Sequence, residues 1–298
     1  MHTAAAPHLT YGQRLTAFAH LCKPRVNSLI VFTAMIGMCL ATPGFPPILR
    51  FLVASLGIAL VSFAAAALNC LVERTIDAKM ARTSWRATAR GDISPLETVT
   101  LATALGVVGL WILHSFINDL TMWLTLATFV GYTVLYTMIL KPATPMNIVI
   151  GGASGAMPPL LGWTAMTGSI APEPLVLFLI IFLWTPPHFW ALACYRRDDY
   201  AKSGLPMLPV THGIAFTCQH ILWYTLMLTA ASLIPVSLGM SGTFYLIAIS
   251  LLDLVFLAYA IALCRHYSDA LARRCFRYSI LYLTLLFAAL FVDRLIVF

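Results

Sequence analysis

Residues 69–86 read NCLVERTIDAKMARTSWR and directly follow an uncharged apolar run at residues 51–68. Asn69, Glu73 and Asp77 are spaced four apart, and a helix places such positions on one face. A carboxamide and two carboxylates then point the same way where an apolar helix leaves a membrane. Oxygen ligands of this kind suit Mg²⁺, which usually joins one or two protein carboxylates to substrate phosphates.

Two arginines follow these acids in the same stretch. Arg82 and Arg86 are also four apart, and guanidinium groups bind phosphate oxygens through parallel hydrogen bonds. The stretch therefore predicts a site where acids hold a divalent metal and arginines hold an anionic substrate. The alternative is a solvated loop whose charges serve only to orient the chain.

The composition predicts an all-α, polytopic membrane protein. Hydrophobic residues make up 60% of the 298 residues and charged residues 10%, and the mean hydropathy is +0.88. A soluble domain carries roughly 25% charged residues, and a soluble fold has no means of covering so much apolar surface. The seven cysteines include no CxxC pair, so they read as small core residues rather than a disulfide framework.

Apolar runs long enough to cross about 30 Å of hydrocarbon predict nine membrane spans. Pro158 and Pro159 interrupt the fifth run, which requires neighbouring groups or a cavity to satisfy the freed carbonyls. The predicted spans are residues 26–42, 51–70, 96–115, 121–140, 146–167, 174–195, 217–236, 242–263 and 277–296.

The distribution of basic residues predicts the orientation of these spans. With the N-terminus in the cytoplasm and the C-terminus outside, sixteen of the eighteen lysine and arginine residues fall on the cytoplasmic side. The positive charge is then a membrane-orienting surface, and it gives no reason to expect nucleic acid. The first twenty residues lack the order of a signal peptide, so a bacterial plasma membrane is the simplest location.

A second group of acids and bases follows the sixth predicted span. Residues 194–213 read CYRRDDYAKSGLPMLPVTHG, and they place Asp198 and Asp199 beside basic residues that include Lys202. This group lies on the same predicted face as residues 69–86 and four spans later, which suggests a duplicated core with a site between its halves. Orientation alone is the alternative, but orientation requires only lysine and arginine.

The sixth span also carries an intramembrane histidine. If the helix continues from His188 to Asp199, the two residues are eleven positions apart. At a rotation of 100° per residue they lie on nearly the same helix face, with Tyr195 between them. Such a histidine is a candidate for substrate contact or iron ligation, and the alternative is a histidine satisfied by a backbone carbonyl. Asp253, in the middle of the eighth span, equally suits a function or a structural pairing.

Asn147 introduces a run of small residues at the start of the fifth span. Glycines there permit close helix packing and also make room for a bulky ligand. Together the predicted site combines metal-binding acids and anion-binding bases at the rim with an apolar, aromatic interior. A substrate with a diphosphate head and a long hydrocarbon tail matches both parts. Mg²⁺ neutralises the leaving diphosphate, and aromatic faces stabilise an allylic cation.

These stretches resemble the intramembrane prenyltransferases related to 4-hydroxybenzoate polyprenyltransferase, and the resemblance runs from about residue 23 to residue 293. The proline-rich motifs point to the branch of this family that acts on haem. The matching motifs are KPRV at 23–26, NCLVERTIDAKMART at 69–83, NIVIGGASGAMPPLLGW at 147–163, LWTPPHFWALA at 183–193 and DYAKSGLPMLPVTHG at 199–213.

The resemblance implies a single nine-helix domain at residues 23–298 after a cytoplasmic segment at residues 1–22. Its catalytic loops are expected at about residues 71–95 and 196–216. The implied reaction moves the farnesyl group of farnesyl diphosphate to a vinyl group of haem B with the help of Mg²⁺. Water then quenches the product cation and leaves a hydroxyethylfarnesyl group. The expected partners are the two substrates, the bilayer and a haem A synthase or terminal oxidase assembly.

The resemblance also assigns roles to residues. Asn69, Glu73 and Asp77 match the first metal–diphosphate motif, and Asp199 matches the core acid of the second. The acids Glu73, Asp77 and Asp199 are expected to reach Mg²⁺ through the diphosphate. The other substrate contacts are assigned to Arg82, Arg86 and Lys202 at the diphosphate, and to Tyr195, His188 and Asn147.

Two positions depart from the family pattern. The family often has a second acid four residues before the core acid of the second motif, and here that place is Tyr195, with Asp198 as a misdirected substitute. Lys141 is followed by Pro142 where a second basic residue is common, so no second cation is expected there.

Two other functions fit parts of the sequence. The same fold with a quinone or chlorin precursor as acceptor is one, although the TPPHFW segment at 185–190 argues against it. A transporter or a non-catalytic haem-handling protein is the other, but transporters place their polar sites near the membrane midplane rather than on one face.

Overall fold

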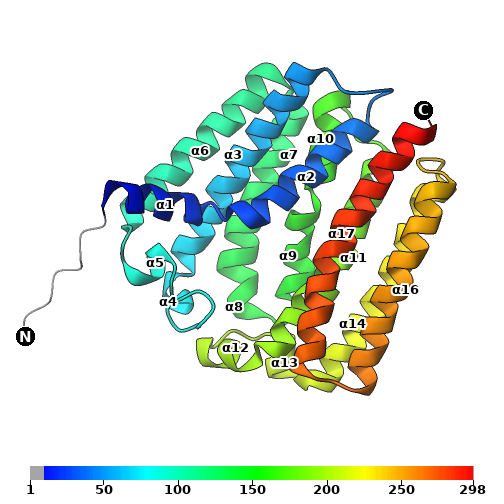
Figure 1. The fold of residues 1–298 in the computed structure, drawn as a ribbon. Coiled ribbons are helices and arrows are strands. Elements are labelled where there is room, and N and C mark those ends of the chain that lie inside the picture. The colour runs from blue at the N-terminus through cyan, green and yellow to red at the C-terminus, as the bar shows by residue number, and fades with distance from the viewer. Residues whose placement is uncertain (1–9, 298) are drawn as a thin grey trace, which may run out of the picture.

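The computed structural model describes residues 10–297, and every regular element in that part of the chain is a helix, which confirms the predicted all-α fold (Figure 1). Residues 1–9 of the predicted N-terminal segment lie outside the described residues. The first helices are α1 (Tyr11–Leu21), α2 (Pro24–Leu40), α3 (Ile48–Val72), α4 (Arg74–Asp77), α5 (Ala87–Arg90), α6 (Pro95–Phe116), α7 (Asp119–Val130), the π-helix η1 (Gly131–Leu140) and α8 (Lys141–Ala143). The later helices are α9 (Asn147–Ala156), α10 (Pro158–Thr167), α11 (Pro172–Tyr195), α12 (Arg197–Ser203), α13 (Leu208–Thr211), α14 (Gly213–Ser232), α15 (Ile234–Ser237), α16 (Thr243–Arg265) and α17 (Asp269–Val297).

Seven helical stretches in the described chain are long and apolar enough to cross a membrane, and each overlaps a predicted span. Large apolar side chains on them, such as Trp111 and Leu254, are 57% and 65% exposed, as expected for surfaces that face lipid. The other two predicted spans are shorter pieces: α2 has 17 residues, and α9 and α10 have ten each. The count of nine spans and their orientation therefore stay predictions.

The two proline pairs have different effects on the chain. Pro158 and Pro159 begin α10, where the missing N–H of proline leaves no bond unmade, so the fifth apolar run is split at Met157. Pro186 and Pro187 lie inside α11, which continues to Tyr195. The second pair therefore does not end its helix.

Two glycines allow α2 and α10 to touch backbone to backbone. A Cβ atom built on Gly162 would lie 1.9 Å from the carbonyl oxygen of Ala34, and one on Gly37 would lie 2.3 Å from that of Pro159. No real Cβ atom comes so close, because close-packed interiors do not yield by more than a few tenths of an ångström. The glycines at these two positions are therefore required for the crossing of these helices.

We predict that Gly162→Ala lowers the unfolding midpoint of the purified protein in detergent, because the added methyl group forces the two helices apart at a cost of about 1–3 kcal/mol or more. Gly155→Ala is the matched control, since a Cβ atom there meets nothing within 4 Å. The control should keep or raise the midpoint, because alanine favours helix over glycine. Equal midpoints for the two variants would contradict the close approach.

Buried acids tie the C-terminal helices together. Asp253 on α16 accepts hydrogen bonds from Ser232 Oγ of α14 at 2.8 Å and from the Tyr282 hydroxyl of α17 at 2.7 Å. Asp293 of α17 accepts from the backbone N–H groups of Gly242 and Tyr245, at 2.5 and 3.0 Å, where α16 begins. A buried polar group is tolerated when it is hydrogen-bonded in this way, which favours the structural reading of Asp253.

Both polar loops lie at one end of the bundle. In Figure 1 the short helices α4 and α5 occupy the same lower end as α12 and α13, while α17 ends at the opposite, upper end. Met80, from the loop after α4, is buried in the same apolar cluster as Tyr200 of α12 and Leu208 of α13. The predicted meeting of the two loops at one face of the bundle is thus observed.

Candidate active site

The first acidic stretch begins in the last turn of α3. Backbone hydrogen bonds from Glu73 to Asn69 (3.0 Å) and from Asp77 to Glu73 (2.7 Å) carry the helical path across the end of α3 into α4. The Asn69 side chain consequently donates to Glu73 Oε1 at 2.7 Å, and it also bonds Thr137 Oγ1 of η1 at 3.2 Å. The expected shared face of Asn69 and Glu73 is therefore present.

Two lysines from other helices complete this cluster. Lys141 Nζ forms an ion pair with Glu73 Oε1, and Lys23 Nζ donates to Asn69 Oδ1. Burial alone would raise the pKa of Glu73, but the positive charges of Lys141 and Lys23 lower it to about 2, so the carboxylate stays ionised. Burial lowers the pKa of Lys23, which lies at the N-terminus of α2.

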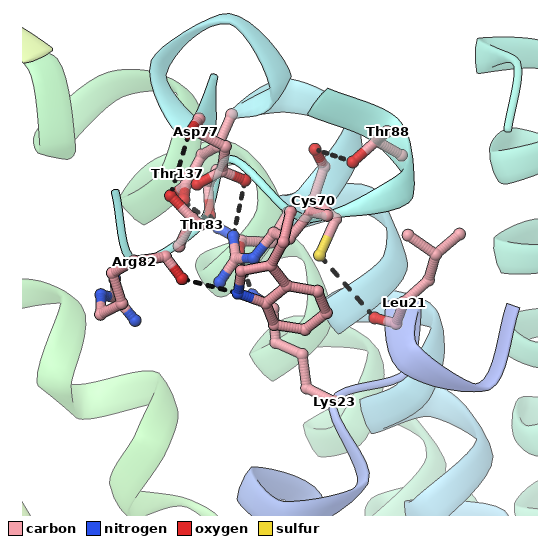
Figure 2. Close-up of polar contacts among 12 residues, drawn as sticks. Leu21, Lys23, Cys70, Asp77, Arg82, Thr83, Thr88 and Thr137 are labelled. Carbon is pink, nitrogen blue, oxygen red and sulfur yellow. Dashed lines mark hydrogen bonds and ion pairs between the residues drawn. The ribbon is translucent and has the colours of Figure 1, made fainter. Parts of the chain in front are cut away.

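Asp77 faces the returning loop, as Figure 2 shows together with Arg82 and Lys23. Arg86 donates to Asp77 Oδ2 at 2.6 Å, and the two side chains are 14% and 3% exposed. Burial lowers the pKa of Arg86, and the neighbouring Cys70 and Asp77 raise it. The second effect is larger, so the pKa of Arg86 is raised overall. The Arg82 side chain is exposed and forms no ion pair in the described chain, while its backbone carbonyl accepts the indole N–H of Trp85 at 2.7 Å.

The second stretch departs from the expected helix. α11 ends at Tyr195, Arg196 leaves the helical conformation with φ −115° and ψ 19°, and α12 begins at Arg197. The shared face of His188 and Asp199 was expected only if one helix joined them, and that condition is not met. No glycine or proline lies at this break, and the residues that follow Tyr195 are two arginines and two aspartates.

Asp199 lies in the first turn of α12, where the partial positive charge of a helix N-terminus favours a carboxylate. Its Oδ2 atom meets a guanidinium nitrogen of Arg196 at 3.4 Å, and its side chain is 17% exposed. Asp198 and Lys202 are exposed on the same short helix. The solvent position of Asp198 agrees with the expectation that it replaces the missing second acid poorly.

His188 is buried within α11 and packs between rings. Its ring stacks on Trp184 at 4.2 Å and on Phe276 of α17 at 4.6 Å between centroids. Its Nδ1 atom lies 2.7 Å from Ser279 Oγ, so its partner is a hydroxyl group rather than the backbone carbonyl of the alternative reading. Nε2 makes no hydrogen bond within residues 10–297.

Asn147 is fully buried at the start of α9. Its side-chain nitrogen donates to the Thr144 carbonyl at 2.6 Å, and its Oδ1 atom has no hydrogen-bond partner in the described chain. A buried acceptor without a donor is costly, which is a reason to expect a substrate group or a water molecule against it.

The two stretches are linked electrostatically. Arg82 lies within electrostatic range of the hydroxyl groups of Tyr136 on η1 and Tyr195 on α11. Tyr136 is also in range of Glu73 and of Tyr200 on α12. The rim therefore runs from the first acidic stretch across η1 to the second.

The acids fit a metal that is shared with a substrate. Within residues 10–297 no three His, Cys, Asp or Glu side chains gather closely enough to hold a metal ion by themselves. Glu73, Asp77 and Asp199 each bond a cationic side chain through one carboxylate oxygen, and the second oxygen makes no hydrogen bond to another described residue. Mg²⁺ commonly takes one or two carboxylates and completes its shell with water and phosphate oxygens, so this donor set suits it.

Sequence reasoning assigned no role to Lys23 or Lys141. Lys141 is the one basic residue between the fourth and fifth predicted spans, and Lys23 directly precedes the first span. Both positions fall on the predicted cytoplasmic side, next to the expected site. An isolated basic residue at the end of an apolar run was therefore the sequence feature that could have indicated these two lysines as part of the site.

We predict that Lys141→Met lowers the unfolding midpoint in detergent, since it leaves the buried Glu73 carboxylate without its ion-pair partner. Breaking a buried pair from one side costs about 3–5 kcal/mol. Lys79→Met, at an exposed position in the following loop, is the control and should leave the midpoint unchanged. A midpoint for Lys141→Met equal to that of the control would contradict the pairing.

A family model for the UbiA prenyltransferase family matches residues 30–289. The match covers most of the sequence, so the chain belongs to the UbiA prenyltransferase family and is a prenyltransferase. A curated relative from Dechloromonas aromatica (strain RCB), named protoheme IX farnesyltransferase, is 90% identical over 297 residues, which is 100% of either chain.

Solved structures share the fold at low sequence identity. A structure described as digeranylgeranylglyceryl phosphate synthase superposes with a TM-score of 0.79 at 19% identity, covering 94% of this chain and 98% of its own. A UbiA homologue from Archaeoglobus fulgidus bound to GPP and Mg²⁺ superposes with a TM-score of 0.63 at 15% identity, covering 92% and 99%. These likenesses support the fold of this chain.

Proposed function

We propose that the chain transfers the farnesyl group of farnesyl diphosphate to a vinyl group of haem B, and that water addition leaves the hydroxyethylfarnesyl group of haem O. The observation that carries this proposal is the 90% identity, over the whole length of both chains, to a protein named protoheme IX farnesyltransferase. The placement of acids and bases at one end of an apolar bundle supports it.

The donor diphosphate lies at the rim between the two acidic stretches. Arg82, Arg86 and Lys202 hold its oxygens, because guanidinium and ammonium groups form charge-assisted bonds to phosphate. Glu73, Asp77 and Asp199 are the residues that would hold Mg²⁺ there. The metal, when bound, supplies Lewis-acid neutralisation of the charge that develops on the leaving diphosphate. The Mg²⁺-bound relative of the same fold supports this assignment.

Asn69 positions the first carboxylate. Its side chain is held by Lys23 and Thr137 and donates to Glu73 Oε1, which leaves Oε2 for the metal. Lys141 keeps Glu73 ionised, so the site is charged before substrate arrives. A site organised in this way loses little free energy to rearrangement during the reaction.

The acceptor and the hydrocarbon tail use the apolar interior. Tyr195 and His188 are substrate contacts there, and His188 uses its Nε2 edge because Trp184 and Phe276 cover the faces of its ring. Asn147 offers an unbonded acceptor to a polar group of a substrate. The dry surroundings of these residues keep water from the allylic cation until the carbon–carbon bond has formed.

We place this enzyme in the inner membrane of a bacterium, as one domain at residues 23–298 after a cytoplasmic segment at residues 1–22. The helix α2 and the pair α9–α10 complete the seven longer helices to nine crossings. The charge asymmetry supports a cytoplasmic N-terminus and site and an outer C-terminus. A haem A synthase or a terminal oxidase assembly is the expected recipient of the product.

We predict that purified protein incubated with haem B, farnesyl diphosphate and Mg²⁺ forms a haem heavier by one farnesyl group and one hydroxyl group, measured by mass spectrometry, because a vinyl group of haem B becomes the hydroxyethylfarnesyl group. EDTA should abolish the product, because the diphosphate then keeps its full charge as it leaves. A prenylated quinone as the only product would support the rival acceptor. Haem binding without any transfer would support a haem-handling protein without catalysis.

We predict that Asp77→Asn and Asp199→Asn each reduce turnover at least about a hundredfold, the scale of losing one key charge-stabilising group. Asp198→Asn is the matched control on α12 and should have a smaller effect, since Asp198 is exposed. Rates like those of the wild type in both Asp77→Asn and Asp199→Asn would remove the metal assignment.

A further inference from the structure

Two arginines lie against the ring of Tyr195, and a third acts on its hydroxyl group from farther away. The guanidinium carbon of Arg273, on α17, lies 5.2 Å from the Tyr195 ring centroid, and that of Arg196 lies 5.7 Å away. Arg82 is within electrostatic range of the Tyr195 hydroxyl. Cation–π contacts hold such groups in place but leave their N–H donors free for other partners.

The positive charge at this point is poorly balanced by acids. Neither Arg273 nor Arg82 forms an ion pair with any residue of the described chain, and Arg196 meets Asp199 only at 3.4 Å. The Nε atom of Arg196 is buried with no hydrogen-bond partner. A buried donor is costly unless something accepts from it, and the arginine fork fits a carboxylate or a phosphate. Arg82 and Arg273 are exposed, so the cluster presents N–H donors that are free for an anionic ligand.

A line of aromatic rings leads inward from these arginines. Phe276 of α17 contacts the Tyr195 ring at 6.2 Å and the His188 ring at 4.6 Å, and His188 in turn stacks on Trp184 at 4.2 Å. This line on α11 and α17 is flat and apolar, whereas its outer end is cationic. It suits a ligand that has a flat apolar body and anionic groups on one edge.

We propose that Arg273, together with Arg196, binds the propionate groups of the haem acceptor and so points the vinyl groups inward, toward the hydrocarbon chain of the donor in the apolar interior. The inference rests on the proposed function, because it takes haem B as the acceptor. Haem B carries both propionates on one edge of a flat ring and its vinyl groups away from that edge. In the view of Figure 1, α12 lies between the base of α17 and α4.

Arg273 acts here as a specificity-determining residue for the acceptor. A phosphate group offers the same kind of acceptor as a propionate, so the donor diphosphate is the competing ligand for this arginine. The two ligands predict different kinetics. Loss of a propionate contact raises the KM for haem B alone, while loss of a diphosphate contact raises the KM for farnesyl diphosphate.

The test uses the full chain in detergent with haem B and with its dimethyl ester, in which both propionates are blocked. We expect Arg273→Gln to weaken haem B binding and raise its KM by about tenfold or more, as for a lost charge-assisted bond. The KM for farnesyl diphosphate should stay within about twofold. The wild type should bind the ester at least as weakly as Arg273→Gln binds haem B. With the ester, Arg273→Gln should bind no more weakly than the wild type does, because the ester already lacks the contact to Arg273.

Two variants separate this role from general effects. Arg273→Lys should recover part of the haem B affinity, since it restores the charge without the fork. Arg274→Gln removes the adjacent exposed arginine and should behave like the wild type.

Three results would overturn the inference: an equal loss in Arg274→Gln, weaker binding of the ester by Arg273→Gln than by the wild type, or a raised KM for farnesyl diphosphate instead. A wild-type protein that neither binds haem B nor forms product would instead contradict the proposed function itself.

Discussion

The ion pair between Glu73 and Lys141 is the constraint on which the reactive end of the bundle depends. It joins the end of α3 to the end of η1, and Lys23 joins the start of α2 to the same cluster through Asn69. Charges at the edge of an apolar bundle are tolerated only when they are paired, so these three segments are fixed relative to one another by the need to compensate one carboxylate. The positions of Asp77 and its loop follow from that anchor.

The number of carboxylate oxygens bonded within the protein distinguishes the structural acids from those of the candidate active site. Asp253 and Asp293 use both of their oxygens on fixed donors within the bundle. Glu73 and Asp77 each bond protein partners through one oxygen only. A fully satisfied buried acid has no capacity for a ligand, whereas a half-satisfied one beside unpaired cations can gain from a metal and a polyanion together. Burial alone would not have distinguished these residues, because all four are buried.

Local sequence patterns predicted much of this arrangement, and the contacts between distant segments account for the rest. The four-residue spacing of Asn69 and Glu73 and the long apolar runs are local features, and both are present in the structure. The partners Lys23 and Lys141 lie 46 and 68 residues from the groups they bond, so no spacing rule reveals them. The end of α11 at Tyr195 agrees with the predicted span at residues 174–195, but the sequence left open a helix that continues to Asp199, because no glycine or proline marks the break. The break lies where a buried helix becomes a charged surface turn.

The same reasoning explains why Arg273 escaped a reading of the motifs. The orientation rule accounts for basic residues at the cytoplasmic ends of helices, so a lysine or arginine there carries no further signal in the sequence. In the structure, Arg273 differs from a merely orienting charge because its guanidinium lies over a half-buried tyrosine that already has Arg196 beside it. Two like charges beside one ring repel each other, and Asp199, at 3.4 Å from Arg196, is the one acid of the described chain that pairs with either of them. The fold therefore accepts a local electrostatic cost at this point, and a bound anion is the simplest means of offsetting it.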